Sequence, residues 1–292
     1  MSDGRVTLTR DHACGIATIT IDNVERRNCY DPAMRRQMAA FLDEAATDDG
    51  IKVVHLRGEG GIFSTGADMG NAYSWYGAGT DKSVGTNGKR RPSQRRRLTV
   101  DRETFTFYHE VTGFPKVIVA EVQGYALGGA FELALMADLT VVGRGTQLGT
   151  PATRFLGPAL GSLHVFFHRL GPVLARRLLL TGDVIDAASI EHLGLFTEVV
   201  DDGDVAARAR WWAEKAARMP ADGIVLAKEA FRLVEQLQAY QGEEVVSYLI
   251  HAYGTNLQFD EGDFNFVKVR AEHGTKRAFE LRDEHFEVPE PR

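Results

Sequence analysis

The sequence has little cysteine, no long apolar run and no excess of positive charge. Only two residues are cysteines, Cys14 and Cys29, which argues against a disulfide framework or a thiolate metal site. No window approaches the roughly 20 consecutive apolar residues that cross a bilayer, so we expect no membrane span. The net charge of −6 gives no overall attraction to nucleic acid. These absences leave an ordinary globular protein.

The composition and the first residues agree with this expectation. The hydrophobic content of 44% and the charged content of 25% are typical of globular chains. The sequence begins directly with strand-like alternation, without a charged and then apolar leader, so we predict a cytoplasmic protein. At 292 residues the chain exceeds the usual size of one domain, and we expect one domain with an appendage.

The first two hundred residues mix predicted strands and helices. Residues 5–10 and 15–21 alternate polar and apolar side chains, which predicts an opening hairpin. Asp31-Pro32 supplies an N-cap and a proline at the first helical position, so a helix follows. The order strand, strand, helix then repeats, which is typical of a coiled ββα solenoid. Later strands are predicted at 51–57, 116–122 and 139–142, an extended piece at 147–148, and helices at about 159–169 and 173–180.

The last ninety residues differ from this core. Helical segments near 204–218, 221–238, 242–257 and 261–272 include no convincing strand. We therefore predict a ββα core over residues 1–200 and a helical module over residues 201–292.

A basic stretch with no apolar periodicity interrupts the predicted core. Residues 77–98 are rich in Gly, Ser, Thr, Asn, Lys and Arg, which predicts a flexible insertion. Its run from Lys89 to Arg97 could attract the phosphates of a ligand, because arginine forks match phosphate geometry. Most charge runs are simply solvated, and we prefer that interpretation. The acidic chain and the lack of interleaved aromatic residues argue against nucleic acid.

Paired glycines before a predicted helix form one candidate site. Gly128 and Gly129 follow a strand and open an apolar helix, so the Gly129 N–H lacks an intrahelical acceptor. The helix dipole adds positive charge there, which suits a developing oxyanion. The alternative is that the glycines only allow a tight connection between strand and helix. A second glycine-containing loop, residues 63–68, is the other candidate site.

Glu132 makes the first candidate more specific. This carboxylate lies one turn into an otherwise apolar helix, and burying it is costly unless it is paired or used chemically. A desolvated carboxylate beside an anion site suits a general acid or base. The alternative is a solvent-exposed glutamate favoured by the helix dipole. Glu121, in a predicted strand, is instead expected to pair with a base or to face solvent.

Four motifs together resemble those of the crotonase, or enoyl-CoA hydratase/isomerase, superfamily. They are Glu25-Arg26-Arg27-Asn28, the segment from Gly58 to Met69, the segment from Gly124 to Leu133, and Leu180-Thr-Gly-Asp183. The resemblance covers about residues 5–205, and the helical tail fits more loosely. It implies an α/β fold with a crotonase-like ββα spiral core and a C-terminal α-helical trimerisation module.

The resemblance also implies roles for single residues. The N–H groups of Ala67 and Gly129 would form an oxyanion hole, and Glu132 would be the catalytic carboxylate. The implied substrate is an acyl-CoA thioester, with coenzyme A as part of the substrate and no further cofactor or metal. It implies homotrimers, commonly paired into hexamers. Residues expected along the substrate or coenzyme A are Arg26, Thr65, Asp68, Met69, Gly128, Pro151 and Ala152.

The sequence departs from the hydratase pattern at one position. Hydratases of this family carry a second glutamate twenty residues after the first, where this chain has Ala152. Two carboxylates let one activate water while the other protonates carbon. We predict an enoyl-CoA hydratase or isomerase of lipid or related carboxylic acid breakdown. Still open are a hydrolase of carbon–carbon or thioester bonds acting on a bulky substrate, and a degenerate protein that only binds acyl-CoA.

Overall fold

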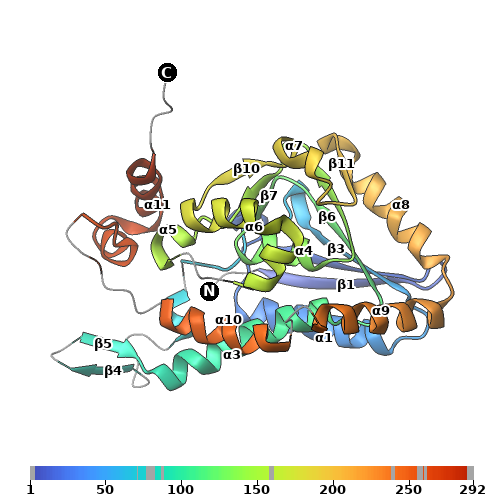
Figure 1. Ribbon diagram of the computed structural model, residues 1–292, viewed down its shortest axis with the longest axis horizontal. Coiled ribbons are helices and arrows are strands. Elements are labelled where there is room, and N and C mark those ends of the chain that lie inside the picture. Colours follow the sequence, from blue (N-terminus) through green and yellow to red (C-terminus); the bar gives the residue numbers. More distant parts are fainter. Residues whose placement is uncertain are drawn as a thin grey trace.

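The computed structural model describes residues 4–70, 72–76, 83–86, 89–157, 161–237, 241–254, 259 and 262–287. Its centre is a six-stranded sheet with the strand order β1-β2-β3-β6-β8-β11 (Figure 1). The first pair is antiparallel, as the predicted hairpin requires, and the other pairs are parallel. The bounds are β1 Arg5–Asp11, β2 Ile16–Asp22, β3 Val53–Gly58, β6 Val117–Val122, β8 Leu139–Gly143 and β11 Glu198–Val200.

A second sheet of three short strands carries the turns that matter for function. It has the order β10-β9-β7, with β7 Tyr125–Leu127, β9 Gln147–Gly149 and β10 Val184–Asp186. β7 follows β6 and leads directly into α4, Gly129–Met136. Between β9 and β10 the chain forms α5, Thr153–Leu156, and α6, Leu163–Thr181, which is interrupted at Gly171. The predicted strands and the mixed α/β class are confirmed.

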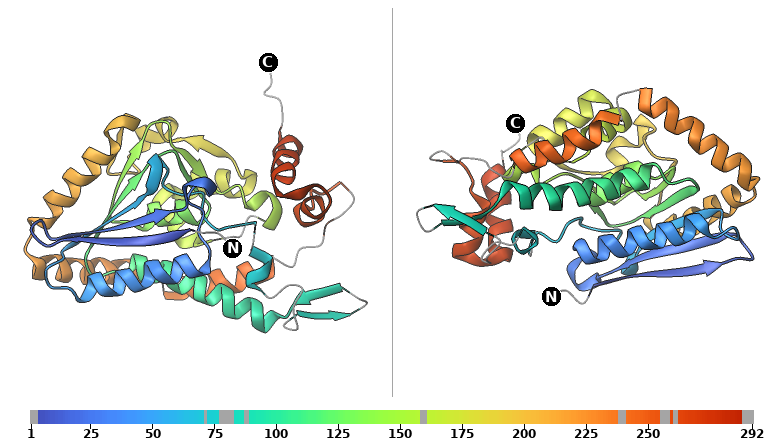
Figure 2. Two further views of the ribbon diagram at one scale, coloured as in Figure 1. Left: turned by 180° about the vertical axis from the view of Figure 1, so that it is seen from behind. Right: turned by 90° about the horizontal axis from the view of Figure 1, so that it is seen from below.

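One face of the large sheet is covered by long helices. α1, Pro32–Thr47, begins as predicted, because the Asp31 carboxylate accepts the Met34 N–H at 2.9 Å. It lies beside α3, Gln94–Thr112, and α10, Gln241–Gly254, runs along α3 (Figures 1 and 2). The buried side chains of α1, α3, α4 and α6 join those of the sheet in one hydrophobic core.

The other face of the large sheet packs against α8, Val205–Ala217. Fully buried valines at positions 53, 119 and 141 meet the small residues of that helix. α8 therefore completes the core of the sheet, although it follows the boundary that we predicted after residue 200. α7, Ala187–Ile190, connects β10 with the last strand.

The insertion was predicted over residues 77–98, and its predicted end is wrong. Residues 94–98 belong to α3, because the Ser93 side chain caps the helix by accepting the Arg96 N–H. Before it, β4, Ser83–Thr86, and β5, Lys89–Pro92, pair as an antiparallel hairpin. Residues 77–82 and 87–88 lie outside the described residues. α2, Ala72–Trp75, precedes this segment.

The C-terminal region is helical, as predicted, with one corrected boundary. α9 spans Ala221–Glu235, and α11 spans Phe266–Phe286, well beyond the predicted end at 272. α11 is interrupted at Gly274, whose φ of 79° is in the left-handed region. None of the helices in the described ranges has the length and apolar character that crossing a membrane requires.

Candidate active site

The two glycine-containing segments meet at one place in the structure. The Ser64 N–H donates to the Tyr125 carbonyl at 2.9 Å, and the Leu127 N–H donates back to the Ser64 carbonyl at 3.3 Å. Gly66, at φ 81°, has no room for a side chain. A Cβ atom there would lie 2.4 Å from the Leu127 carbonyl oxygen and 3.1 Å from the Gly129 nitrogen. The loop before Ala67 is thus packed against the turn that opens α4.

The backbone around Ala67 leaves its N–H unused. Tyr30 donates its N–H to the Gly66 carbonyl and accepts the Asp68 N–H, at 2.9 and 3.0 Å. This parallel bridge uses the groups on either side of Ala67, so the Ala67 N–H faces away from Tyr30. Across the described residues, the Ala67 N–H has no protein acceptor.

Gly129 provides the second unused donor. It is the first residue of α4, and its N–H has no acceptor within the described part of the chain. Gly128 has a φ of 55° and donates its own N–H to the Gly149 carbonyl at 2.8 Å, which fixes the turn. Ala67 and Gly129 are both half-buried. Two neighbouring N–H donors in this setting can hold an oxyanion.

Glu132 lies one turn further along α4, and it is buried with 6% exposure. Its Oε2 accepts the Ser162 N–H at 2.8 Å, at the N-terminus of α6. Gly161 closes over the same carboxylate, because a Cβ atom there would lie 2.6 Å from Oε1. The alternative of a solvent-exposed Glu132 is therefore wrong. A buried carboxylate beside two backbone donors can transfer protons.

Arg26 and Asp68 form an ion pair beneath the Ala67 loop. Arg26 donates to both carboxylate oxygens of Asp68, at 2.8 and 2.6 Å. Asp68 is buried, and its Oδ1 also accepts the Gly70 N–H at 3.0 Å. Asp68 thus braces the loop that carries Ala67, while Arg26 stays partly exposed. Contact of either residue with coenzyme A stays a prediction.

The remaining predicted residues make contacts within the protein. Thr65 is held by its N–H and hydroxyl, both of which donate to the Arg27 carbonyl. Met69 and Ala152 pack against Phe266 and Ala278 of α11 in a small apolar cluster. Pro151 accepts the Arg154 N–H at 3.2 Å. Ala152, which stands where the family pattern has the second glutamate, therefore has an apolar setting. A part of these four residues in substrate binding stays a prediction.

Two tyrosines at the site were not predicted from the sequence. The hydroxyl groups of Tyr30 and Tyr108 lie 2.8 Å apart, and both side chains are buried. A Cβ atom built on Gly129 would lie 2.0 Å from the Tyr108 hydroxyl and 2.6 Å from that of Tyr30. Tyr30 lies just before α1, and Tyr108 is on α3. No spacing in the sequence relates them, because only the packing of α3 against α4 brings them together.

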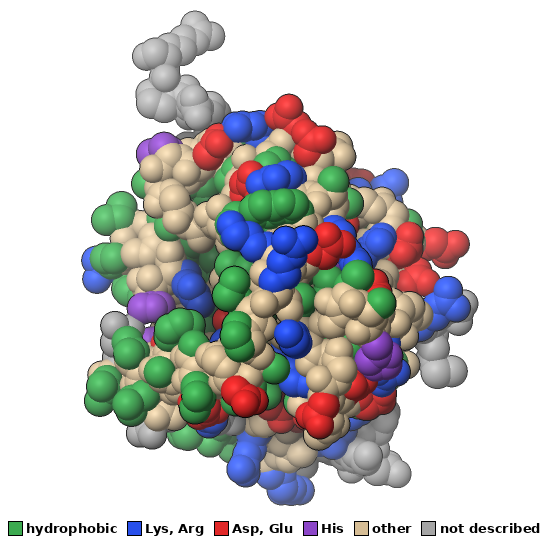
Figure 3. Space-filling model, turned by 90° about the vertical axis from the view of Figure 1, so that its right-hand side faces the viewer, with side chains coloured by type: hydrophobic (Ala, Val, Ile, Leu, Met, Phe, Trp, Pro, Cys, Tyr) green, Lys and Arg blue, Asp and Glu red, His purple; other side chains and the backbone are tan. Residues whose placement is uncertain are grey.

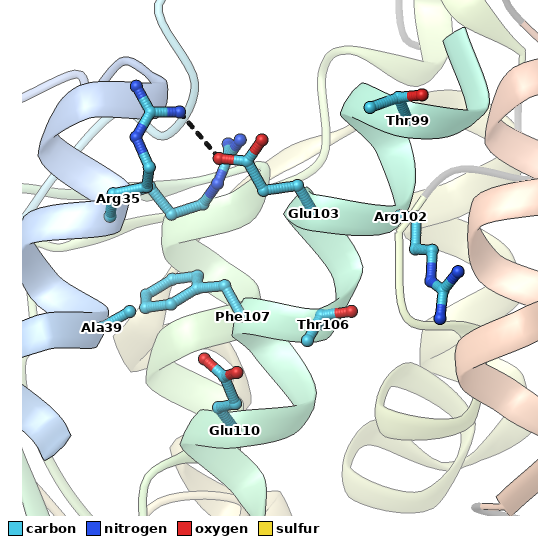
Figure 4. A pocket seen from close by; sticks show the side chains of 9 residues that line it. Arg35, Ala39, Thr99, Arg102, Glu103, Thr106, Phe107 and Glu110 are labelled. Atoms are coloured by element: carbon cyan, nitrogen blue, oxygen red, sulfur yellow. Dashed lines mark hydrogen bonds and ion pairs between the residues drawn. The ribbon is translucent and has the colours of Figure 1, made fainter. Parts of the chain in front are cut away.

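Glu121 and a groove between α1 and α3 belong to other parts of the molecule. Glu121 pairs with His55 at 3.0 Å on the sheet face that α8 covers, which confirms the expected base partner. A groove of about 650 Å³ lies between α1 and α3 (Figure 4). Arg36 and Glu103, which line it, form an ion pair at 2.7 Å. None of the predicted site residues lines this groove.

The fold and this arrangement of backbone donors and carboxylate define an acyl-thioester enzyme of the crotonase class. The sequence matches the enoyl-CoA hydratase/isomerase family over residues 11–276, and the chain belongs to that family. Similar structures include an enoyl-CoA hydratase/isomerase from Xanthobacter autotrophicus Py2. That structure has a TM-score of 0.82 and 25% identity, with 97% of this chain and 99% of that chain covered.

Two sequence relatives bear the names of different reactions. A putative enoyl-CoA hydratase of Thermus thermophilus is 29% identical over 214 residues, which are 73% of this chain and 79% of that protein. The 1,2-epoxyphenylacetyl-CoA isomerase of Escherichia coli is 27% identical over 222 residues, which are 76% and 80% of the two chains. This chain is thus an acyl-CoA thioester-processing enzyme of the hydratase/isomerase type.

Proposed function

We propose that the enzyme hydrates or isomerises an enoyl-CoA thioester, with Glu132 as the proton-transfer group. The observation that carries this proposal is the meeting of two unused backbone N–H groups, at Ala67 and Gly129, with a buried carboxylate one helical turn away. The thioester oxygen would accept both N–H groups. Negative charge would gather on that oxygen as a proton or a water molecule adds or leaves.

Preorganised donors suit this chemistry because they cost no reorganisation when the charge develops. Removing one such donor typically costs about 10²–10³ in rate. The Gly128 bond to Gly149 and the Arg26–Asp68 pair keep the two donors in place. The Ser162 N–H holds one oxygen of Glu132 and so fixes the orientation of the carboxylate.

Ala152 influences which reaction is favoured. A single carboxylate is sufficient to move a proton between two carbon atoms, which is double-bond isomerisation. Hydration needs a second proton carrier in place of the glutamate that the family pattern puts at this position. The apolar cluster of Ala152 with α11 supports a site that works without a carboxylate there. The proposed chemistry uses no metal or redox cofactor, and we place it in acyl-CoA breakdown in the cytoplasm.

We also propose that the protein forms trimers through its C-terminal helices. α9 carries a row of exposed apolar side chains, and green side chains gather at the lower left of Figure 3. Large apolar patches on a surface mark contacts with other chains. Those exposed on α9 and just beyond its end are Val225, Leu226, Phe231, Leu233, Val234 and Leu237.

The test is turnover of a panel of enoyl-CoA esters, followed by double-bond absorbance and by product mass. A mass increase of one water reports hydration, whereas unchanged mass with a shifted double bond reports isomerisation. Glu132→Gln should lower kcat by about 10²–10⁴, the usual contribution of general acid–base catalysis. Equal turnover by wild type and Glu132→Gln would contradict the role of Glu132. Tight binding of saturated acyl-CoA without turnover of any panel member would favour a binding protein.

A further inference from the structure

The paired hydroxyl groups of Tyr30 and Tyr108 are polar groups that the proposed reaction does not yet use. They come from separate parts of the chain, and their oxygen atoms lie 2.8 Å apart. Tyr30 has no exposed surface and Tyr108 is 4% exposed. Buried hydroxyl groups are normally fully hydrogen-bonded, so the partners of these two groups can be counted.

One of the two hydroxyl protons has no acceptor among the described residues. Each phenol has one O–H proton and can also accept a hydrogen bond. The contact between the two oxygen atoms uses one of the two protons. No acceptor for the other proton exists among the described residues. A buried donor in this state costs free energy unless something that binds there accepts it.

The spare proton is close to the reacting atoms. Both hydroxyl groups pack against the α-carbon of Gly129, since a Cβ atom there would lie 2.0 and 2.6 Å from them. The N–H of the same residue is the proposed donor to the thioester oxygen. Glu132 lies on the same helix, one turn away. The acyl carbons of a thioester held by Gly129 would therefore lie beside the tyrosine pair and the carboxylate.

The surroundings keep the phenols neutral but provide a cation. Burial raises the pKa of both tyrosines, and the charge of Glu132 raises it further. Each tyrosine is therefore a donor at neutral pH. Arg35 acts in the opposite direction on both pKa values. Arg35 is 3% exposed, and its Nη2 has no acceptor in the described part of the chain, so its charge can stabilise a transient phenolate.

We propose that the Tyr30–Tyr108 pair is the second proton carrier of the site and protonates the acyl α-carbon. The inference rests on the proposed function. In hydration, the water oxygen bonds to the β-carbon while Glu132 takes one water proton, and the electron pair of the double bond moves into the enolate. The α-carbon then takes a proton from a phenol, and the protonated Glu132 returns its proton to the phenolate. The sum is one water added.

The pair would thus take the role of the carboxylate that the family pattern puts at Ala152. A neutral phenol needs no charge in the ground state, which suits a buried position. This role also explains why two hydroxyl groups lie in the core next to Gly129. Two apolar side chains would fill the same space at a lower cost in free energy.

The experiment compares Tyr108→Phe, Tyr30→Phe and the double variant with wild type, on the panel member that wild type turns over. Each single variant should lower kcat by about 10²-fold and change KM by less than about threefold, as expected for a step after binding. Transfer of solvent deuterium to the α-carbon, measured by mass spectrometry in D₂O, should fall in parallel. The double variant should be about as slow as the slower single variant, because the two hydroxyl groups act as a unit.

Thr140→Val is the matched control. It also removes a buried hydroxyl, which donates to the Ala134 carbonyl at 2.7 Å near the far end of α4. It should lower stability without the loss of kcat. The inference is overturned if both tyrosine variants keep kcat, or if their losses match the fraction of unfolded protein as in Thr140→Val. If wild type and Glu132→Gln behave as proposed in that case, only the inference fails. If wild type turns over no panel member, the proposed function fails, and the inference fails with it.

Discussion

The Ser162 N–H donates to Oε2 of Glu132 at 2.8 Å, which ties the proposed catalytic carboxylate of α4 to the N-terminus of α6. Gly161 precedes this donor with a φ of 81°, and its α-carbon faces the same carboxylate. The loop before α6 therefore fixes the orientation of the Glu132 carboxylate. Its geometry leads to the first prediction.

Gly161→Ala should lower both kcat and stability. The new Cβ atom would lie 2.6 Å from Oε1 of Glu132, and the left-handed backbone is strained for alanine. We expect a loss in kcat of about 10²-fold or more, because an ångström of misplacement is enough for that. Steady-state kinetics and thermal unfolding measure the two effects. Gly203→Ala is the control, since a Cβ atom there meets nothing within 4 Å. Wild-type kinetics in Gly161→Ala would contradict the proposed geometry.

Asp68→Asn should loosen the loop that carries Ala67. The change removes the charge that Arg26 binds through two hydrogen bonds, in a buried position. We expect a stability loss of about 1.5–3 kcal/mol, the usual contribution of a hydrogen bond to a charged group. Because the same loop holds the Ala67 N–H in place, kcat should fall as well. Urea unfolding and steady-state kinetics are the measurements. Unchanged values for both would show that the pair does not brace the loop.

Stability should fall at alkaline pH because of buried acidic groups. Burial raises the pKa of Cys29 to about 11 and raises the pKa of Tyr30 and Tyr108 above their usual value. In the unfolded chain these groups lose protons near pH 9 to 10, while the folded protein keeps them. The folded state then binds more protons, so the free energy of unfolding declines as pH rises above about 9. Urea unfolding between pH 8 and 11 measures this decline. Tyr30→Phe should make it shallower, and an equal slope in the variant would contradict the assignment.

The apolar row of α9 should hold copies of the chain together. Leu226 is 71% exposed and Phe231 is 59% exposed in the single chain. Leu226→Glu with Phe231→Glu should convert trimers into monomers, because charges at a buried contact would be unpaired. Light scattering coupled to gel filtration gives the mass. Glu229→Gln, a change to an exposed residue of the same helix, is the control. A wild-type protein that is monomeric at micromolar concentration would contradict the proposal.

Local patterns in the sequence predicted much of the architecture. The alternation of β1 and β2, the cap at Asp31 and the apolar runs of β3, β6 and β8 are short-range signals, and the structure confirms them. The predicted boundaries at residues 98 and 272 were wrong. The helix at Ser93 starts within a basic run that has no apolar spacing, and Gly274 interrupts α11 without ending it. Capping and packing decide such boundaries, and neither is visible in periodicity.

The sequence by itself determined that Gly128, Gly129 and Glu132 lie together, because a strand, a turn and a helix place them within a few residues. Only the tertiary structure decided that Tyr30 and Tyr108 reach the same point, and that Ser162 and Gly161 close over Glu132. Glu132 and Ser162 are 30 positions apart in the sequence, and Tyr30 and Tyr108 are 78 positions apart. Their contacts depend on how α3 and α6 pack against α4. No local spacing encodes that packing, because it results from burying the apolar faces of several helices at once.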